Sequence, residues 1–226
     1  MNLINWYDAG FSDYDEDLLL QRALHDRVVA GESPGCILFQ ENRPVITLGR
    51  DKKESSLVWS RERIAGAGIA LREVERGGDA TFHGPGILVA SPVLRFLEYA
   101  STAHLYLRML EETVIRQCEA YGLSCFRKSG KSGVWLNDGK LSAVGVAVMR
   151  SVTMHGLSIN VDPDFTYFSA IVPCGLTGEG VTSLAAHGVN VSVQKARDDF
   201  LAAFSKVFSA EVLPAQQITK ENNKGD

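Results

Sequence analysis

The sequence predicts a single α+β domain in which helices flank a mixed or antiparallel sheet. Apolar β-type runs recur with short turns between them, and three long segments carry helical periodicity. No linker, internal repeat or low-complexity tract divides the 226 residues. With 45% hydrophobic and 22% charged residues, the composition is that of a globular protein with a substantial core. We expect one domain over residues 1–215 and a disordered tail over residues 216–226.

Three long helices are predicted from their end signals and apolar faces. The first spans roughly residues 13–29, with acidic residues in its first turns and Gly31 as its C-cap. The second is capped by Ser101 or Thr102 and reaches Tyr121, and the third is capped by Ser192 and covers about residues 193–207. Each places apolar side chains three or four positions apart, so one face of each helix is expected to be buried.

The remaining segments predict strands and one irregular loop. Predicted strands span residues 36–40, 45–49, 69–75, 87–94, 133–136, 140–148 and 152–161. The first two form a strand, turn, strand pattern, and an Asp-Gly turn makes the pair 133–136 and 140–148 the clearest hairpin. A short helix is expected at residues 59–65. Residues 76–86 contain so much glycine, with a proline, that we predict a loop there.

Charge and cysteine usage exclude several classes of protein. A net charge of −4 argues against nucleic acid as a partner. The N-terminus has no basic region followed by an apolar run, and no segment has the length of a membrane span, so a cytoplasmic location without membrane association is expected. The scattered cysteines have neither CxxC pairs nor histidine spacing for zinc, which predicts a reducing compartment and no metal; they are Cys36, Cys118, Cys125 and Cys174.

Two basic clusters interrupt this acidic chain. Each is either a solvated face or a docking surface for an acidic partner. Their members are Arg50, Lys52 and Lys53 in the first cluster and Arg127, Lys128 and Lys131 in the second.

A cysteine at a sharp turn is the first candidate for chemistry. An apolar run ends at Pro173-Cys174-Gly175, where proline restricts the backbone and glycine allows close approach by another molecule. The thiol is either a nucleophile or a small buried apolar group. A nucleophilic Cys174 needs a base or a cation beside it, because a thiol is mostly protonated at neutral pH.

Two histidines and one lysine are the candidate partners of this thiol. His83 and His155 each precede a glycine in or beside the glycine-rich loop, and each has a structural or a chemical role. Lys140 opens a strand of small and apolar residues; it is either the exposed end of that strand or a desolvated group that exchanges a proton with the thiol. The loop matches neither a P-loop nor a Rossmann pattern. We interpret its glycines as walls of a narrow slot for an extended apolar ligand, with Gly145 and Gly156 as its floor.

Motifs in a fixed order identify a family. They are Pro44-Val45-x-Thr47-Leu48-Gly49-Arg50, Arg76-Gly77-Gly78-x-x-Thr81-Phe82-His83-Gly84-Pro85-Gly86, Gly139-Lys140-Leu141 through Gly145, His155-Gly156-Leu157-x-x-Asn160-Val161, and Pro173-Cys174-Gly175 with Val181-Thr182-Ser183-Leu184. Together they resemble the lipoyl(octanoyl) transferases over most of the chain. The resemblance implies a fold like the catalytic domain of biotin and lipoate ligases, and a catalytic acyltransferase domain over residues 1–215.

The resemblance also implies an activity and partners. An octanoyl group would pass from octanoyl-acyl carrier protein to Cys174 as a thioester, and then to a lysine of lipoyl domains. Those domains belong to 2-oxoacid dehydrogenase E2 subunits, to the glycine cleavage H protein, or to both, and no cofactor is implied. Lys140 would activate the thiol and shuttle its proton. The acyl slot would be lined by Arg76, Gly77, Gly78, Asp79, Ala80, Thr81, Phe82, His83, Ala143, Val144, Gly145, Gly156, Leu157 and Ser158.

The chemistry of the residues agrees with two acyl transfers through one covalent intermediate, which is a ping-pong scheme. No ATP is needed, because the incoming thioester is already activated. Each oxyanion would be stabilised by backbone N–H groups near Gly175 or in the glycine-rich loop. Three alternatives remain open: an ATP-dependent lipoate–protein ligase of the same fold, a cysteine thioesterase, and a non-catalytic module that binds carrier proteins.

Two positions depart from the family pattern. Ile87 stands where glutamine usually follows Gly-Pro-Gly, and Asn42 stands where histidine is frequent. Ile87 puts in doubt any polar contact that the glutamine would make beside the slot, and the preferred acyl chain is left open.

Overall fold

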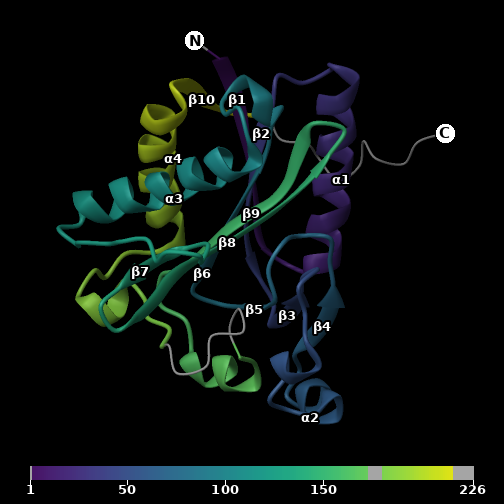
Figure 1. Cartoon of the computed structure of the whole chain (residues 1–226), viewed down its shortest axis with the longest axis vertical. Helices are drawn as coiled ribbons and strands as arrows, with labels where there is room; N and C mark the ends of the chain where they lie inside the picture. Colours follow the sequence, from purple (N-terminus) through teal and green to yellow (C-terminus); the bar gives the residue numbers. More distant parts are fainter. Residues whose placement is uncertain (1, 173–179, 216–226) are drawn as a thin grey trace.

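A computed structural model describes residues 2–172 and 180–215 of the chain. These residues form a large mixed sheet with helices on both faces, and a small sheet lies below it (Figure 1). The predicted α+β fold with a mixed sheet and flanking helices is therefore confirmed. In the described part of the chain, no helix is both long enough and apolar enough to traverse a lipid bilayer.

The large sheet has seven strands in the described residues. Strand β1 pairs in parallel with β10 and β2, and every other pair in this sheet is antiparallel. In spatial order the strands are β10 (Ala210–Pro214), β1 (Asn2–Ser12), β2 (Cys36–Asn42), β6 (Ile87–Val93), β9 (Val152–Asn160), β8 (Gly139–Met149) and β7 (Val134–Leu136).

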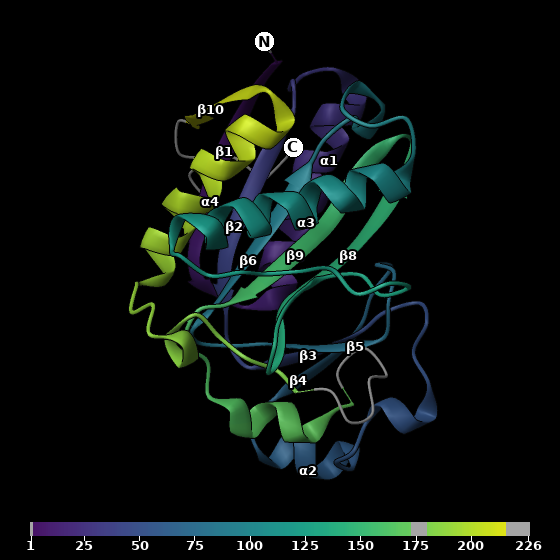
Figure 2. The same ribbon diagram turned by 60° about the vertical axis from the view of Figure 1, so that its left-hand side comes forward.

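Three long helices cover the two faces of this sheet. Helices α3 (Ala103–Ala120) and α4 (Val193–Phe208) pack on one face over the main apolar core (Figure 2). Helix α1 (Tyr14–Ala30) packs on the opposite face, where Leu24 and Val28 meet apolar residues of β2, β6 and β9. Alternation along the strands separates these two faces, because successive side chains of a strand point to opposite sides.

The helix ends agree with the predicted caps. Gly31 adopts a left-handed conformation with φ of 80°, and its N–H donates to the carbonyls of Arg27 and Val28. The hydroxyls of Thr102 and Ser192 accept the N–H groups of Leu105 and Lys195, which would otherwise lack partners at the helix start. These caps are local, and for this reason the sequence located the helix ends to within a few residues.

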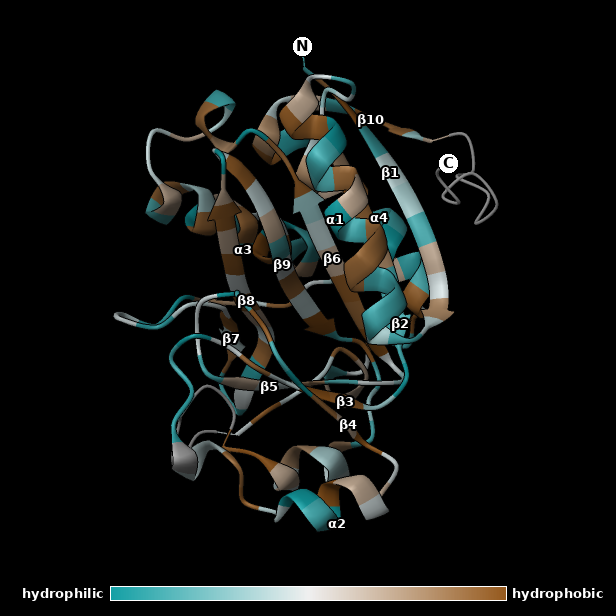
Figure 3. Cartoon of the chain, turned by 90° about the vertical axis from the view of Figure 1, so that its right-hand side faces the viewer, coloured by the Kyte–Doolittle hydropathy of each residue, from teal (hydrophilic) through white to brown (hydrophobic). Residues whose placement is uncertain are grey.

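The small sheet lies below the large sheet and carries the glycine-rich motif. Its strands, in spatial order, are β4 (Ala70–Glu73), β3 (Val45–Leu48) and β5 (Ala80–His83). Helix α2 (Arg61–Gly66) lies at the lower end of the molecule, as the side view in Figure 3 also shows. Short 3₁₀ segments span Glu54–Ser56, Phe96–Glu98, Phe165–Ala170 and Ala185–His187.

The structure corrects the prediction for residues 36–49. Both strands are present, but β2 and β3 belong to different sheets and do not pair with each other. Strand β2 already has β1 on one edge and β6 on the other, so no edge is left for β3. The N–H of Arg43 donates to the carbonyl of Ser12 at 2.9 Å, which is the last bond between β1 and the chain that leaves β2.

The sequence analysis missed strands β1, β5 and β10. Strands β1 and β10 pair in parallel with each other across about 200 residues of sequence, as in the register Asn2 to Ala210. No turn signal marks such a pair. Strand β5 lies inside residues 76–86, which we predicted to be a loop, and it is held by antiparallel pairing with β3. Only the residues that flank β5 are irregular.

Candidate active site

A β-bulge directs the Lys140 side chain into a cavity beside the large sheet. In the β7–β8 hairpin Trp135 pairs with Lys140, whereas Val134 pairs with Ser142, so β8 contains one extra residue. An extra residue breaks the alternation of side chains and re-aims its neighbours. Leu141 consequently joins the apolar core under α3 and α4, while Lys140 lines the cavity and is only 5% exposed.

The Lys140 side chain is confined by its neighbours. Its Nζ lies 4.8 Å from the centroid of the fully buried Trp135 ring, within the range of a cation–π interaction. Gly133 also contacts it: a Cβ on Gly133 would lie 2.7 Å from Lys140 Cε. The backbone is fixed as well, since the Lys140 N–H donates to the Gly180 carbonyl at 2.9 Å and the Lys140 carbonyl accepts the Thr182 N–H at 3.1 Å.

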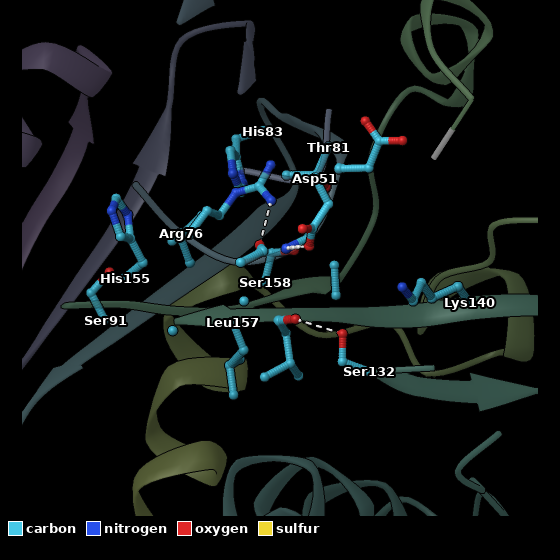
Figure 4. Close-up of a pocket in the computed structure, with 18 of the residues that line it drawn as sticks. Asp51, Arg76, Thr81, His83, Ser91, Ser132, Lys140, His155, Leu157 and Ser158 are labelled. Atoms are coloured by element: carbon cyan, nitrogen blue, oxygen red, sulfur yellow. Dashed lines mark hydrogen bonds between the residues drawn. The ribbon is translucent and has the colours of Figure 1, made fainter. Parts of the chain in front are cut away.

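The cavity has a volume of about 270 Å³, and one face of the large sheet forms its floor. In the middle of this floor, Gly145 on β8 pairs with Gly156 on β9, and Ala143 pairs with Ser158. The predicted glycine floor is thus present, and the lack of large side chains opens the space. Figure 4 shows Lys140 at one end of the cavity and His155 and Ser91 at the other.

The glycine-rich segment forms the roof of this cavity. The Gly77 N–H donates to the Val146 carbonyl at 3.0 Å, which joins the segment to β8. A Cβ on Gly145 would lie 2.7 Å from the Gly77 carbonyl oxygen, so the close approach requires glycine on the strand. Arg76 stabilises the turn: its guanidinium donates to the backbone and side-chain oxygens of Thr47 at 2.8 Å, and to the Gly77 carbonyl at 3.0 Å.

Alternation along β5 decides which motif residues reach the cavity. Thr81 and His83 line it, whereas Ala80 and Phe82 point to the other side and pack in the core of the small sheet. Ala80 and Phe82, both predicted to line the slot, therefore do not line it. The other predicted slot residues do border the cavity: Arg76, Gly77, Gly78, Asp79, Thr81, His83, Ala143, Val144, Gly145, Gly156, Leu157 and Ser158.

The two candidate histidines are neutral near pH 7. Burial, with Arg76 nearby, lowers the pKa of His83 to about 3, and the same two causes lower the pKa of His155 to about 4. The His83 ring stacks on Tyr14, with centroids 6.1 Å apart. Neither histidine is suited to hold a proton at neutral pH. We therefore assign His83 and His155 to the cavity wall.

The inner end of the cavity contains residues that the sequence analysis missed. They come from α1, β2 and β6 and are mostly polar: Tyr14, Leu18, Gln21, Gln40, Val89 and Ser91. Gln40 lies in a run of apolar residues on a central strand, and its Oε1 has no hydrogen-bond partner among the described residues. A buried amide within an apolar strand is a signal that the sequence does contain. Small residues thus form the middle of the cavity floor, and mostly polar residues line its inner end.

Neither of the two departures from the family pattern lines this cavity. Ile87 is fully buried in the core of the small sheet and does not line the cavity. Ile87, Val89 and Ser91 share one face of β6; Val89 and Ser91 line the cavity, whereas Ile87 lies farther along the strand and packs among Phe82 and its neighbours. Asn42 donates from Nδ2 to the Asp17 carboxylate at 2.7 Å and is likewise buried.

Three backbone amides of the glycine-rich loop, where oxyanion donors were predicted, are engaged in hydrogen bonds that hold the loop. The Gly77 N–H donates to the Val146 carbonyl, the Gly78 N–H donates to Asp51 Oδ2 at 2.8 Å, and the Ala80 N–H donates to Asp79 Oδ1 at 2.8 Å. These three amides stabilise the loop itself. These amides therefore cannot donate to an oxyanion while the loop keeps this conformation.

The predicted nucleophile Cys174 lies outside the described residues, which stop at Val172 and resume at Gly180. The residues at both boundaries are hydrogen bonded. The Val172 N–H donates to the Ser56 carbonyl at 2.9 Å, and the Gly180 carbonyl accepts from Lys140. The chain thus re-enters the described structure directly beside Lys140. Within the described residues, no group of three His, Cys, Asp or Glu side chains is placed to bind a metal ion.

Comparison with known proteins identifies the class to which this fold and site belong. Residues 13–205 match the family described as "Lipoyl protein ligase A/B catalytic domain". A lipoate protein ligase from T. acidophilum, solved with bound lipoic acid, has the same fold with a TM-score of 0.77 at 17% identity, over 98% of this chain and 91% of that one. The chain belongs to the lipoyl protein ligase A/B catalytic domain family.

Within this family the similar curated proteins are octanoyltransferases. The octanoyltransferase of Thermoanaerobacter pseudethanolicus is 39% identical over 201 residues, which is 88% of this chain and 87% of that protein. The octanoyltransferase of Geotalea uraniireducens is 38% identical over 222 residues, which is 98% of this chain and 99% of that protein. The family and the acyltransferase activity inferred from the motifs are confirmed, and the ATP-dependent alternative is not favoured.

Proposed function

We propose that the chain transfers an octanoyl group from octanoyl-acyl carrier protein, through a thioester on Cys174, to a lysine of lipoyl domains. Those acceptors are E2 subunits of 2-oxoacid dehydrogenases, the glycine cleavage H protein, or both. The catalytic domain is assigned to residues 1–215 and the location to the cytoplasm. One observation carries the proposal: Lys140 is confined beside a glycine-floored cavity, and the chain that follows Cys174 resumes at its backbone.

The proposed reaction has two steps with one proton carrier. Lys140 accepts the thiol proton, and the Cys174 thiolate attacks the incoming thioester. The new S–C bond forms, the bond to the carrier thiol breaks, and Lys140 returns the proton to that thiol. In the second step, the acceptor amine attacks the enzyme thioester, the amide C–N bond forms and the C–S bond to Cys174 breaks. Lys140 takes the proton that the amine loses and returns it to the Cys174 thiolate. The acyl chain lies along the floor of Ala143, Gly145 and Gly156, where it is shielded from water.

Intact-mass measurement tests this reaction. Incubation with octanoyl-acyl carrier protein and no ATP is expected to add one octanoyl mass that hydroxylamine removes, because a thioester is labile to this nucleophile. Cys174→Ser is expected to show no such adduct. Addition of a lipoyl domain should move the mass to a lysine of that domain.

Each other outcome supports a different alternative. Activity that appears only with ATP and free octanoate contradicts the transferase in favour of a ligase. Release of free octanoate in the presence of a lipoyl domain favours a thioesterase. Carrier binding without chemistry in either condition favours a binding module.

The basic residues at the cavity mouth predict a salt-dependent effect on carrier binding. Lys131 borders the cavity, and Lys128 lies 5.7 Å from the Trp135 ring. Charge reversal at both, Lys128→Glu with Lys131→Glu, is expected to raise KM for an acidic carrier about 3- to 10-fold at low salt with little change in kcat. Lys206→Glu on α4 is the control at a distant surface. A KM that does not change at low salt would show that the two lysines form only a solvated surface.

A further inference from the structure

We propose that Glu111 is a positioning residue that holds the backbone of Gly133 against the Lys140 side chain. The inference rests on the proposed function, because it assigns Glu111 a role in placing the proton carrier of that reaction. Glu111 lies on α3, on the face of the sheet opposite the cavity, and its side chain is only 1% exposed. Removing a carboxylate from water to this degree costs free energy of folding unless the group is paired and fully hydrogen bonded.

The Glu111 carboxylate makes one hydrogen bond to backbone and two to arginines. Its Oε1 accepts the Gly133 N–H at 2.8 Å. Its Oε2 accepts from Arg108 Nη1 at 2.6 Å and from Arg127 Nε at 3.1 Å. Arg108 lies one turn earlier on the same helix. Arg127 and Gly133 are the first and last residues of the segment 127–133. The two arginines compensate the buried charge through Oε2. The other oxygen, Oε1, binds the backbone of the segment at Gly133.

Gly133 links this carboxylate to the proposed proton carrier. Its φ of 124° lies in the region that favours glycine. A Cβ at this position would lie 2.7 Å from Lys140 Cε and 3.4 Å from Lys140 Nζ. The Gly133 backbone therefore touches the part of the lysine that carries the charge. Movement of Gly133 would change the space available to the ammonium group.

The rest of the segment is attached to the large sheet. Phe126 and Trp135 exchange two backbone hydrogen bonds of 2.9 Å, and Trp135 carries the ring that faces Lys140. The Ser132 hydroxyl donates to the Val144 carbonyl at 3.0 Å, which Figure 4 marks with a dashed line on the Lys140 side of the cavity. Glu111 completes these attachments, because it holds the residue that lies between Ser132 and β7.

Glu112 provides a matched control on the same helix. Its carboxylate also binds Arg127, with Nη2 at 2.7 Å, and binds Arg116 at 2.8 Å. Gly133 donates to Glu111 and not to Glu112. Removal of either acid costs Arg127 one ionic partner, but only removal of Glu111 releases Gly133.

The test compares Glu111→Gln, Glu111→Leu and Glu112→Leu in steady-state octanoyl transfer. Glu111→Leu is expected to lower kcat on the order of 10- to 100-fold with KM for both protein substrates unchanged, as for a misplacement of about 1 Å. Glu111→Gln keeps an oxygen for the Gly133 N–H and is expected to retain kcat within about 3-fold, and Glu112→Leu within about 2-fold. All variants are assayed well below their melting temperatures.

A second readout does not require turnover. The rate at which an amine-reactive anhydride labels Lys140 is measured by peptide mass mapping, and it is expected to change several-fold in Glu111→Leu but not in Glu112→Leu. Equal kcat and equal labelling in the two leucine variants would overturn the inference. So would a Glu111→Gln enzyme as slow as Glu111→Leu, because the charge and not the bond to Gly133 would then matter. A wild-type enzyme that forms no octanoyl adduct would contradict the proposed function, while the labelling rates would still decide the role of Glu111.

Discussion

Replacement of Lys140 by methionine is expected to lower kcat for octanoyl transfer by about 10³-fold. The substitution keeps most of the apolar stem of the side chain but removes the group that we propose moves the proton in both acyl transfers. Loss of a positioned proton carrier typically costs about 10²- to 10⁴-fold. Because Lys140 is 5% exposed and lies against the Trp135 ring, no solvent-borne group occupies the same position.

Two measurements separate this effect from damage to the fold or to substrate binding. Single-turnover mass spectrometry gives the rate at which the octanoyl adduct forms, and steady-state kinetics gives KM for the carrier. Lys53→Met is the control, since Lys53 also borders the cavity but is exposed. If Lys140→Met keeps more than about a tenth of the wild-type kcat, Lys140 is not the proton carrier.

The second large effect is expected on stability from Gly156→Ala. A Cβ at this position would lie 2.3 Å from the Ala90 carbonyl oxygen and 2.7 Å from Pro92 Cδ, so β6 and β9 would have to separate. Overpacking against backbone costs about 1–3 kcal/mol, or more where the contact cannot relax. For a chain of this length, this loss corresponds to a fall in Tm of roughly 3–10 °C.

Thermal unfolding and chemical denaturation measure this loss directly. Gly66→Ala is the matched control, because a Cβ at Gly66 would meet no atom within 4 Å and its backbone is not in the left-handed region. We expect Gly66→Ala to leave Tm unchanged or slightly raised. A Gly156→Ala protein with a wild-type Tm would show that β6 and β9 can separate at little cost.

The cavity explains why the large sheet contains such small residues at its centre. Gly145 and Gly156 face each other on β8 and β9, with Ala143 and Ser158 beside them. Their side chains leave room for a ligand between the sheet and the glycine-rich roof. Val144 and Leu157 border the cavity as well, but they also pack with Ile159 in the core under α3 and α4. One pair of strands therefore builds the core with one face and lines the cavity with the other.

The neutral histidines shape this site rather than act in it. Burial lowers the pKa of His83 to about 3, so protonation of His83 would occur only far below neutral pH. The folded protein disfavours the charged ring, and the stability that comes from the neutral form is lost as pH falls below the ordinary histidine pKa. Lys140 therefore remains the candidate proton carrier, and its backbone N–H binds the resumed chain at the Gly180 carbonyl.

The sequence by itself determined the parts of this protein that depend on near neighbours. Helix ends were predicted because Gly31, Thr102 and Ser192 satisfy amides and carbonyls within a few residues. The β7–β8 hairpin was predicted because its Asp-Gly turn joins adjacent strands. The family and its octanoyl chemistry were predicted from collinear motifs, and the comparisons confirm them.

Only the tertiary structure decided which side chains meet. Strands β1 and β10 are far apart in sequence, and β2 and β3, although adjacent in sequence, take partners in different sheets. The face that each residue presents depends on register and bulges: alternation sends Phe82 to the core and His83 to the cavity, and one extra residue in β8 turns Lys140 inwards. Glu111 reaches Gly133 across 22 residues and from the opposite face of the sheet. Such contacts depend on long-range pairing, for which a local pattern of residue types contains no signal.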